Sequence, residues 1–297
     1  MGHSSFVFRQ TEQHMKLTIG LAQISPRLGD VKANLDKHLH FVEQATEQGV
    51  QLLVFPELSL TGYMLQDLVH EVARTPSPED PLLAPLVEAS HRLDLVVGLA
   101  ERDVRGRLFT AGAYLSQGRI VHVHRKVYLP TYGMFDEGRD FDWGEEVHAF
   151  DTRFGRTGLL ICEDFWHASP PYLLWLDGAD FLLLTSASPG RGIDHRGKLG
   201  SSRFVELVNQ AYANLFGCFV VHVNRVGFED GVNFWGGSTV FGPDGELIAQ
   251  APYFEEALLV TALDLSALRR ARARLPLLRD ERPELTRREL ERILSKM

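Results

Sequence analysis

Short apolar runs alternate along the chain with segments whose apolar residues recur at helical spacing. The first run, Lys16–Ile24, predicts a buried strand, and Asp30–Gln48 predicts a helix that ends at Gly49. A second apolar run, Val50–Phe55, follows at once. A strand, a helix and a strand in this order predict two parallel strands with the helix on one face of their sheet.

The same alternation continues along the chain, and turn sequences interrupt it. Gln117-Gly118 and Pro243-Asp244-Gly245 each separate two apolar runs, which predicts two antiparallel hairpins. Gly236-Gly237-Ser238 lacks the pattern of a phosphate-binding loop and is expected to mark a close approach of two backbone segments. The further predicted strands are Leu95–Leu99, Leu108–Leu115, Arg119–His124, Val147–Phe150, Thr157–Ile161, Phe181–Leu184, Cys218–Val223, Thr239–Phe241, Glu246–Ala249 and Ala257–Leu263. The further predicted helices are Leu82–Arg92, Tyr172–Leu176 and Lys198–Phe216.

No linker or low-complexity segment divides the chain, which predicts a single α/β domain over residues 16–297. Residues 1–15 are polar and lack the apolar core of a signal peptide, so we expect a disordered N-terminal extension there. From Leu265 onward the chain is rich in Arg and Glu of interspersed sign. This pattern is more typical of a solvated helical face than of a partner-binding arm, so a charged helical tail is expected.

Composition excludes some classes of function without selecting one. The net charge of −8 argues against a nucleic-acid partner. The two cysteines, Cys162 and Cys218, are too few for a disulfide framework and suit a reducing compartment. No apolar run approaches the length of a membrane span. We therefore expect a cytoplasmic protein with no membrane partner.

Three of the apolar runs end at a polar side chain. Glu57 follows the run that ends at Pro56, Lys126 follows the run that ends at Arg125, and Cys162 follows Thr157–Ile161. Ligands of open α/β sheets bind outside the carboxyl ends of the strands. A carboxylate, an ammonium and a thiol at such ends together suggest a thiol hydrolase. Taken alone, the cysteine fits a buried core residue equally well.

The sequence around these residues resembles the carbon–nitrogen hydrolase (nitrilase) superfamily, whose members use a Glu–Lys–Cys triad. Five segments carry the resemblance in the family's order: Phe55–Tyr63, Lys126–Glu137, Cys162–Trp166, Ser186–Pro189 and Gly236–Ser238. The likeness extends from about Lys16 to Leu263, and it is greatest to the glutaminase domain of glutamine-dependent NAD synthetase. It implies a four-layer αββα sandwich whose outer helices pair subunits into a homodimer or a larger homo-oligomer.

The resemblance also implies a role for each polar residue. Cys162 would be the nucleophile, Glu57 the general base, and Lys126 the cation that holds the thiolate and then the oxyanion. Chemistry requires the same set, because an ordinary thiol is mostly protonated near pH 7 and the developing negative charge needs a donor. The backbone N–H of Glu163 is expected to be a second donor. Glu137 matches a second family glutamate, which would hydrogen-bond the lysine and the substrate amide or help the attacking water, and its alternative is an ordinary loop carboxylate.

Other residues match the family's substrate pocket. Tyr63 and Tyr132 match lining aromatic residues, with ordinary packing as the alternative for each. Ser188 and Arg191 fall where the family contacts the amino-acid end of glutamine, and Glu163 joins them as a substrate-binding residue through its backbone.

Two histidines and the second cysteine are assigned no chemistry. His122 and His124 share one face of a strand, but a metal site would need further ligands, so no metal and no cofactor is expected. Cys218 opens an apolar strand and is expected in the core.

We therefore expect an amidase that hydrolyses a small linear amide, such as glutamine, to a carboxylate and ammonia through a cysteine thioester. One alternative is a nitrilase acting on a C≡N bond. Another is a glutaminase subunit that supplies ammonia to a separate NAD synthetase, because the chain ends without the family's ATP-dependent ligase domain. A non-catalytic partner subunit is disfavoured, since a scaffold has no physical need to keep Glu57, Lys126, Cys162 and Glu137 together.

Overall fold

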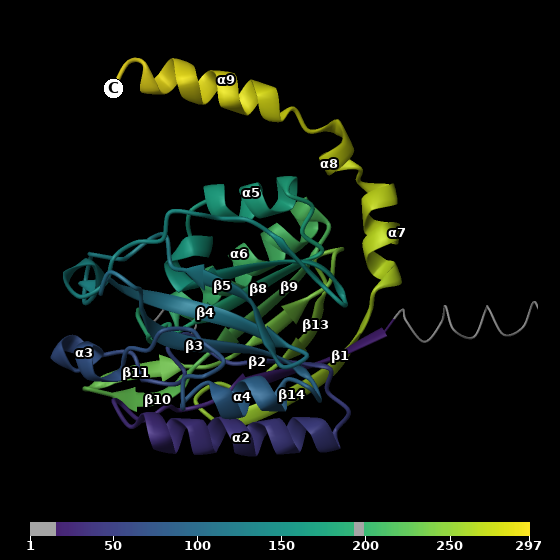
Figure 1. Cartoon of the computed structure of the whole chain (residues 1–297). Helices are drawn as coiled ribbons and strands as arrows, with labels where there is room; N and C mark the ends of the chain where they lie inside the picture. Colours follow the sequence, from purple (N-terminus) through teal and green to yellow (C-terminus); the bar gives the residue numbers. More distant parts are fainter. Residues whose placement is uncertain (1–15, 193–198) are drawn as a thin grey trace, which may run out of the picture.

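The computed structural model of the protein describes residues 16–192 and 199–297 (Figure 1). Two six-stranded β-sheets pack face to face, and helices cover the outer face of each sheet. This arrangement confirms the αββα sandwich expected from the sequence. The expected N-terminal extension, residues 1–15, lies outside the described residues.

The first sheet has the strand order β14-β1-β2-β3-β4-β5. Its strands are β1 (Lys16–Gln23), β2 (Leu52–Val54), β3 (Asp94–Arg102), β4 (Leu108–Ser116), β5 (Arg119–Arg125) and β14 (Ala257–Asp264). Strands β1, β2 and β3 run parallel, and the strand–helix–strand pattern predicted this for β1 and β2. The other strands pair antiparallel, including the hairpin predicted at Gln117-Gly118. Helices α2 (Val31–Glu47) and α4 (Ala84–Ala89) pack on the outer face.

The second sheet has the order β13-β12-β9-β8-β7-β6. Its strands are β6 (Phe150–Thr152), β7 (Gly155–Ile161), β8 (Phe181–Ser186), β9 (Phe219–Asn224), β12 (Thr239–Phe241) and β13 (Leu247–Gln250). The central strands β7, β8 and β9 run parallel, so their carboxyl ends meet at one edge. Helices α5 (Ser169–Leu176) and α6 (Gly200–Phe216) cover the outer face, and the start predicted for α6 at residue 198 lies outside the described residues.

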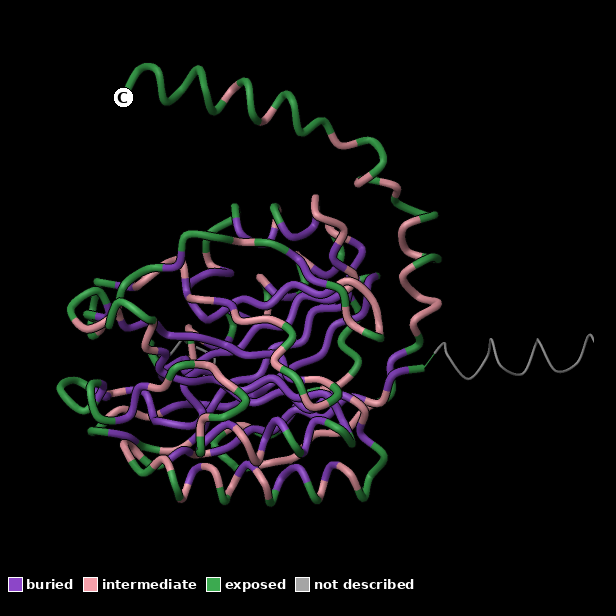
Figure 2. Tube along the Cα trace, viewed as in Figure 1, coloured by how far each residue is buried: buried purple, intermediate pink, exposed green. Residues whose placement is uncertain are grey.

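Apolar side chains from both sheets meet in the central layer. Ile19 and Tyr114 of the first sheet share one buried cluster with Leu159, Phe181 and Val221 of the second. Two further clusters lie beneath the outer helices, and Figure 2 shows the buried trace concentrated in the strands. Burial on both faces explains why so many strands read as continuous apolar runs rather than as alternating ones.

The observed elements differ most clearly from the predicted ones in three places. The strand predicted at Val147–Phe150 is displaced to β6, because the preceding segment is tied to the end of β5, where the Gly144 N–H donates to the Lys126 carbonyl (2.7 Å). The helix predicted at Leu82–Arg92 is limited to the shorter α4. The hairpin of β10 (Val226–Glu229) and β11 (Val232–Trp235) was not predicted, because its strands are short and half-exposed.

The C-terminal tail is helical, as predicted. It consists of α7 (Ser266–Arg274), α8 (Leu277–Asp280) and α9 (Pro283–Leu294). The tail leaves the body and its residues are largely exposed (Figures 1 and 2). One contact with the body is the Tyr172 hydroxyl of α5, which lies 3.2 Å from both Glu281 Oε1 and Thr286 Oγ1.

Candidate active site

Glu57, Lys126 and Cys162 follow β2, β5 and β7, and the two sheets bring these strand ends together. The Lys126 ammonium lies 2.8 Å from Glu57 Oε1. The charges of Lys126 and Glu57 both act on the Cys162 thiol, and all three side chains are buried. The carboxylate, ammonium and thiol predicted from separate parts of the sequence therefore share one buried site.

The Lys126 ammonium stands between two carboxylates. Its Nζ donates to Glu57 Oε1 and, at 2.7 Å, to Glu137 Oε1. Complete burial would lower the pKa of Lys126, but the negative charges of Glu137 and Glu57 outweigh burial and hold that pKa well above its ordinary value. The lysine is thus a fixed cation across the physiological pH range.

Cys162 is presented by a sharp turn at the end of β7. Its φ of +46° lies in the left-handed region, and it opens the short 3₁₀ helix η3 (Cys162–Phe165). Side chains other than glycine adopt this region at a cost of about 1–3 kcal/mol, and such conformations concentrate at functional sites. Burial, followed by the charge of Glu57, raises the pKa of Cys162 well above its ordinary value, although Lys126 opposes this shift. The cysteine therefore rests as a thiol.

Glu137 occupies the position expected of the fourth polar residue, in η2 (Glu137–Arg139). Its Oε1 accepts the Lys126 ammonium and, at 2.5 Å, the hydroxyl of Tyr63. Burial raises the pKa of the Glu137 carboxyl to about 6, because the nearby Lys126 charge only partly offsets desolvation and Glu57 adds to it. Tyr63 is buried and belongs to the same network rather than to general packing alone.

Ser188 lies at the carboxyl end of the neighbouring strand β8, with its Oγ 4.0 Å from the Cys162 sulfur. The preceding Ala187 N–H donates to Glu57 Oε2 (2.7 Å), which fixes the second oxygen of that carboxylate. Asn224 at the end of β9 accepts the Ser188 N–H (2.8 Å). Residues at or just after the carboxyl ends of β2, β7, β8 and β9 thus converge on one centre.

The remaining predicted residues form a more open group. The Tyr132 hydroxyl donates to Glu163 Oε2 (2.9 Å), and the Arg191 guanidinium lies over the rings of Tyr132 (5.8 Å) and Phe135 (5.3 Å). The Tyr132 side chain is 44% exposed, so this group faces the solvent side of the site. A cavity of about 280 Å³ opens beside Glu137, and Phe135 is among its lining residues.

Two residues that hold the Tyr63 loop were missed at the sequence level. Glu229 Oε1 accepts the backbone N–H groups of Tyr63 (2.7 Å) and Met64 (2.6 Å). Its other oxygen accepts from Arg225 (2.6 Å), whose guanidinium is fully buried over the Phe234 ring. No local signal in the sequence indicates this pairing, since Glu229 and Tyr63 are 166 positions apart.

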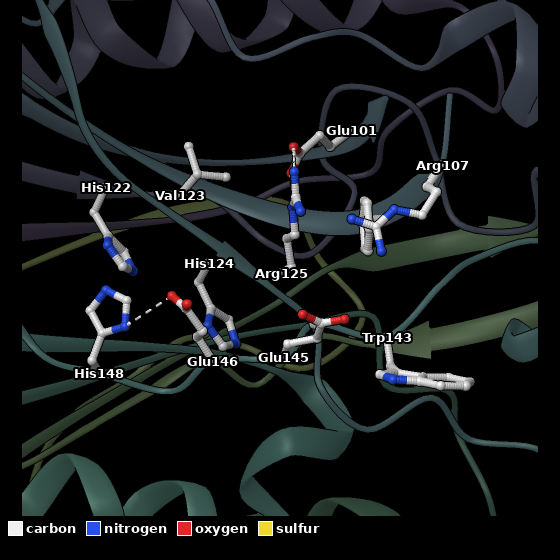
Figure 3. Close-up of a pocket in the computed structure, with 12 residues that line it drawn as sticks. Glu101, Arg107, His122, Val123, His124, Arg125, Trp143, Glu145, Glu146 and His148 are labelled. Carbon is white, nitrogen blue, oxygen red and sulfur yellow. Dashed lines mark hydrogen bonds and ion pairs between the residues drawn. The ribbon is translucent and has the colours of Figure 1, made fainter. Parts of the chain in front are cut away.

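A second cavity of about 300 Å³ lies along β5, outside the polar centre. In Figure 3, His122 from β5 faces His148 of the following segment, His124 points toward Glu146, and Arg125 turns to Glu101, to which it donates hydrogen bonds. His122 stacks on Phe150 at 4.1 Å, and burial lowers its pKa to about 3.

Cys218 and the glycines Gly236 and Gly237 lie outside the polar centre. In the part of the chain that the structure describes, no three His, Cys, Asp or Glu side chains are arranged to hold a metal ion. Cys218 lies in the core beneath α6, where burial raises its pKa to about 12. Gly236 and Gly237 have positive φ, and their N–H groups donate to the carbonyl oxygens of Arg225 (3.1 Å) and Pro252 (3.3 Å), which confirms the predicted close backbone approach.

Comparison with known proteins gives a consistent result. A model of the carbon–nitrogen hydrolase family matches residues 18–273. The chain is 33% identical over 260 residues to a glutamine-dependent NAD(+) synthetase of Aquifex aeolicus, with 86% of this chain and 44% of that protein covered. The chain thus spans about half the length of the curated relatives it matches.

Two solved structures illustrate the similarity in three dimensions. A carbon–nitrogen hydrolase from Helicobacter pylori has a TM-score of 0.84 at 24% identity, with 93% and 98% of the two chains covered, and it supports the fold alone. An amidase from Nesterenkonia sp. AN1, which carries a covalently added acetamide moiety at its active-site cysteine, has a TM-score of 0.76 at 25% identity over 92% and 96% of the two chains.

Among the helices that the structure describes here, none combines the length and apolarity needed to cross a bilayer.

Proposed function

The chain belongs to the carbon–nitrogen hydrolase family, and from this premise we propose that it is an amidase acting on a small linear amide. The observation that carries the proposal is the Lys126 ammonium held between Glu57 and Glu137 beside the Cys162 thiol. A thiol, a carboxylate base and a fixed cation in one buried site are the groups that acyl transfer through a thioester requires.

In the proposed acylation step, Glu57 accepts the thiol proton as the Cys162 sulfur attacks the amide carbon. A base is needed because the thiol has a raised pKa and rests protonated. The carbonyl oxygen becomes an oxyanion, which accepts hydrogen bonds from the Lys126 ammonium and the Glu163 backbone N–H. One such donor contributes about 3–4 kcal/mol to transition-state stabilisation. The C–N bond then breaks, and the leaving nitrogen takes the proton from Glu57 and departs as ammonia.

Deacylation repeats the same steps with water as the nucleophile. Glu57 accepts a proton from water, the water oxygen attacks the thioester carbon, and the oxyanion again bonds to Lys126. The C–S bond breaks, the proton returns from Glu57 to the Cys162 sulfur, and the carboxylic acid product leaves. The net reaction consumes one amide and one water and yields one carboxylic acid and one ammonia. Glu137 and Tyr63 would keep the lysine aimed at the reacting atoms.

We propose a substrate with an amino-acid-like end, such as glutamine. The support is the open group beyond Cys162, where Arg191 offers a cation, Glu163 a carboxylate and Tyr132 a hydroxyl. Relatives named glutamine-dependent NAD(+) synthetases favour the same substrate. A second candidate follows from these relatives: the chain would be a glutaminase that supplies ammonia to a separate synthetase.

The test is ammonia release from a panel of linear amides and matched nitriles, with Cys162→Ala as the control. The proposal expects turnover of an amide and none in the variant. Faster release from nitriles than from the corresponding amides would favour a nitrilase instead. Turnover that survives Cys162→Ala would contradict the proposed mechanism, and release stimulated by an added NAD synthetase would favour the ammonia-supplying role.

We also propose that the protein is a cytoplasmic homodimer or larger homo-oligomer. Four large apolar side chains are exposed on α5 and α6: Leu173, Phe204, Leu207 and Leu215. Sedimentation velocity would test the assembly, with a monomer at all concentrations as the contrary result. A reducing compartment suits a free catalytic thiol, which oxidation would inactivate.

A further inference from the structure

Asp164 is a buried carboxylate that joins two parts of the proposed site. Its Oδ1 accepts the backbone N–H groups of Val127 and Tyr128, both at 2.9 Å. Its Oδ2 accepts the Ile161 N–H at 3.0 Å, and the side chain has no solvent exposure. Three backbone donors beside Lys126 and Cys162 therefore depend on one side chain.

A fourth donor comes from outside the site. His124 Nε2 lies 2.9 Å from Asp164 Oδ2, and because an ionised carboxylate only accepts, Nε2 carries the hydrogen. His124 is two residues before Lys126 on β5 and lines the cavity of about 300 Å³ shown in Figure 3. Both carboxylate oxygens of Asp164 thus accept two hydrogen bonds each, and the His124 imidazole that donates one of them lines a cavity.

We infer that Asp164, oriented by His124, is a positioning residue that sets the Lys126 ammonium against the Cys162 thiol. The inference rests on the proposed roles of Lys126 and Cys162. Asp164 follows the nucleophile by two positions and holds the two residues after the lysine, so its carboxylate fixes both chain segments relative to each other. Asp164 touches none of the reacting atoms in the proposed mechanism, and its effect on the reaction passes through geometry.

The direction in which the pKa of Cys162 moves in Asp164→Asn distinguishes a positioning role of Asp164 from the effect of its charge alone. Removing a negative charge near the thiol would, by electrostatics alone, lower the pKa of Cys162. Moving the Lys126 ammonium away would raise that pKa, because Lys126 is a cation that lowers it. Positioning therefore predicts slower alkylation of the thiol in Asp164→Asn, whereas loss of charge alone predicts faster alkylation.

The experiment compares Asp164→Asn with Asp94→Asn by iodoacetamide labelling of Cys162 across a pH range and by steady-state amide hydrolysis. Asp94 is a matched control, since it is equally buried, accepts from the hydroxyls of Tyr114 and Ser116, and lies at the opposite end of the sheet. For Asp164→Asn we expect the labelling midpoint to rise by about one pH unit, which slows labelling about tenfold. We also expect kcat to fall about 10- to 100-fold with a nearly unchanged KM. Asp94→Asn should change neither.

Labelling needs no substrate, so it can fail separately from the proposed function. Turnover lost in Cys162→Ala but normal in folded Asp164→Asn would overturn this inference alone. Faster labelling of Asp164→Asn, or an equal kcat loss in Asp94→Asn, would also overturn it. Absence of amide turnover in the wild type would remove the proposed function and this inference with it.

If Asp164→Asn fails to fold, rescue of His124→Gly by added imidazole tests the same inference, because His124 lines the cavity. We expect a lower kcat that free imidazole restores, because the ring can enter from the adjoining space and donate to Asp164. His122→Gly is the control, since His122 lines the same cavity and instead stacks on Phe150. Unchanged kcat in His124→Gly, or a loss that imidazole does not restore, would overturn the inference.

Discussion

Replacing Tyr63 by Phe removes one hydroxyl from the centre of the proposed site and keeps the ring in place. The hydroxyl donates to Glu137 Oε1 at 2.5 Å, and this hydrogen bond lowers the pKa of Glu137 against the opposing effect of burial. The ring itself packs edge-on against Phe234 at 5.9 Å, which the substitution retains. The change therefore isolates one hydrogen bond to a buried carboxylate.

The magnitude follows from that bond. A hydrogen bond to a charged group contributes about 1.5–3 kcal/mol, and each pKa unit corresponds to about 1.4 kcal/mol. The pKa of Glu137 should thus rise from about 6 to about 7–8 in Tyr63→Phe. At pH 7 about a tenth of the wild-type carboxyl is protonated, against about half or more in the variant. Protonation removes one of the two charges that hold Lys126, so activity is lost on the acid side.

The assay is kcat/KM for amide hydrolysis from pH 5 to pH 9. We expect the acid limb of the Tyr63→Phe profile to move upward by about 1–2 pH units, with wild-type activity recovered at high pH. Tyr114→Phe is the matched control, because the Tyr114 hydroxyl donates to buried Asp94 (2.7 Å) far from the site. Tyr114→Phe should lower the free energy of unfolding by a similar amount without moving the acid limb of the pH profile. An unmoved acid limb in folded Tyr63→Phe, or an equal movement in Tyr114→Phe, would show that the Tyr63 hydroxyl does not set the pKa of Glu137.

Three further predictions test the surrounding structure. Iodoacetamide should label Cys162 in the native protein and Cys218 only after denaturation, as peptide mass spectrometry would reveal; native labelling of both would contradict the assignment of Cys218 to the core. Glu229→Gln should lower the free energy of unfolding by about 3–5 kcal/mol in denaturant titrations, because it leaves the Arg225 charge buried without its partner; a loss below 1 kcal/mol would count against this. Gly236→Ala should lower the free energy of unfolding by at least about 2 kcal/mol in the same titrations, since the glycine has φ +69° and a Cβ there would lie 2.6 Å from Gln23 Nε2. Wild-type stability of this variant would show that the neighbouring side chains move aside without cost.

The fold could be predicted where burial gives the sequence a clear pattern. Strand β1, helix α2 and strand β2 were predicted in order, because both sheet faces are covered and the strands are continuous apolar runs. The hairpin β10–β11 escaped prediction for the opposite reason, since Phe228 is exposed and Gly227 interrupts the short run. Residues 144–149 show a third case, in which a contact with the distant end of β5 displaces a locally plausible strand.

The site could be predicted at its centre and less completely around it. Glu57, Lys126 and Cys162 are each visible as a polar residue at the end of an apolar run. The residues that hold them are not, because Asp164, Glu229 and Asn224 act through partners far along the chain. The sequence next to a buried carboxylate does not show which distant loops it binds, so such a residue is recognised only in the folded structure.

In the proposed reaction, Cys162 attacks an amide carbon and carries the acyl group as a thioester. Acid quenching during turnover of a slow amide, followed by peptide mass spectrometry, tests this most directly. We expect the Cys162 peptide to gain the mass of the acyl group, the Cys218 peptide to remain unmodified, and the adduct to be absent in Cys162→Ala. Turnover with no adduct on Cys162, or an adduct elsewhere that persists in Cys162→Ala, would contradict it.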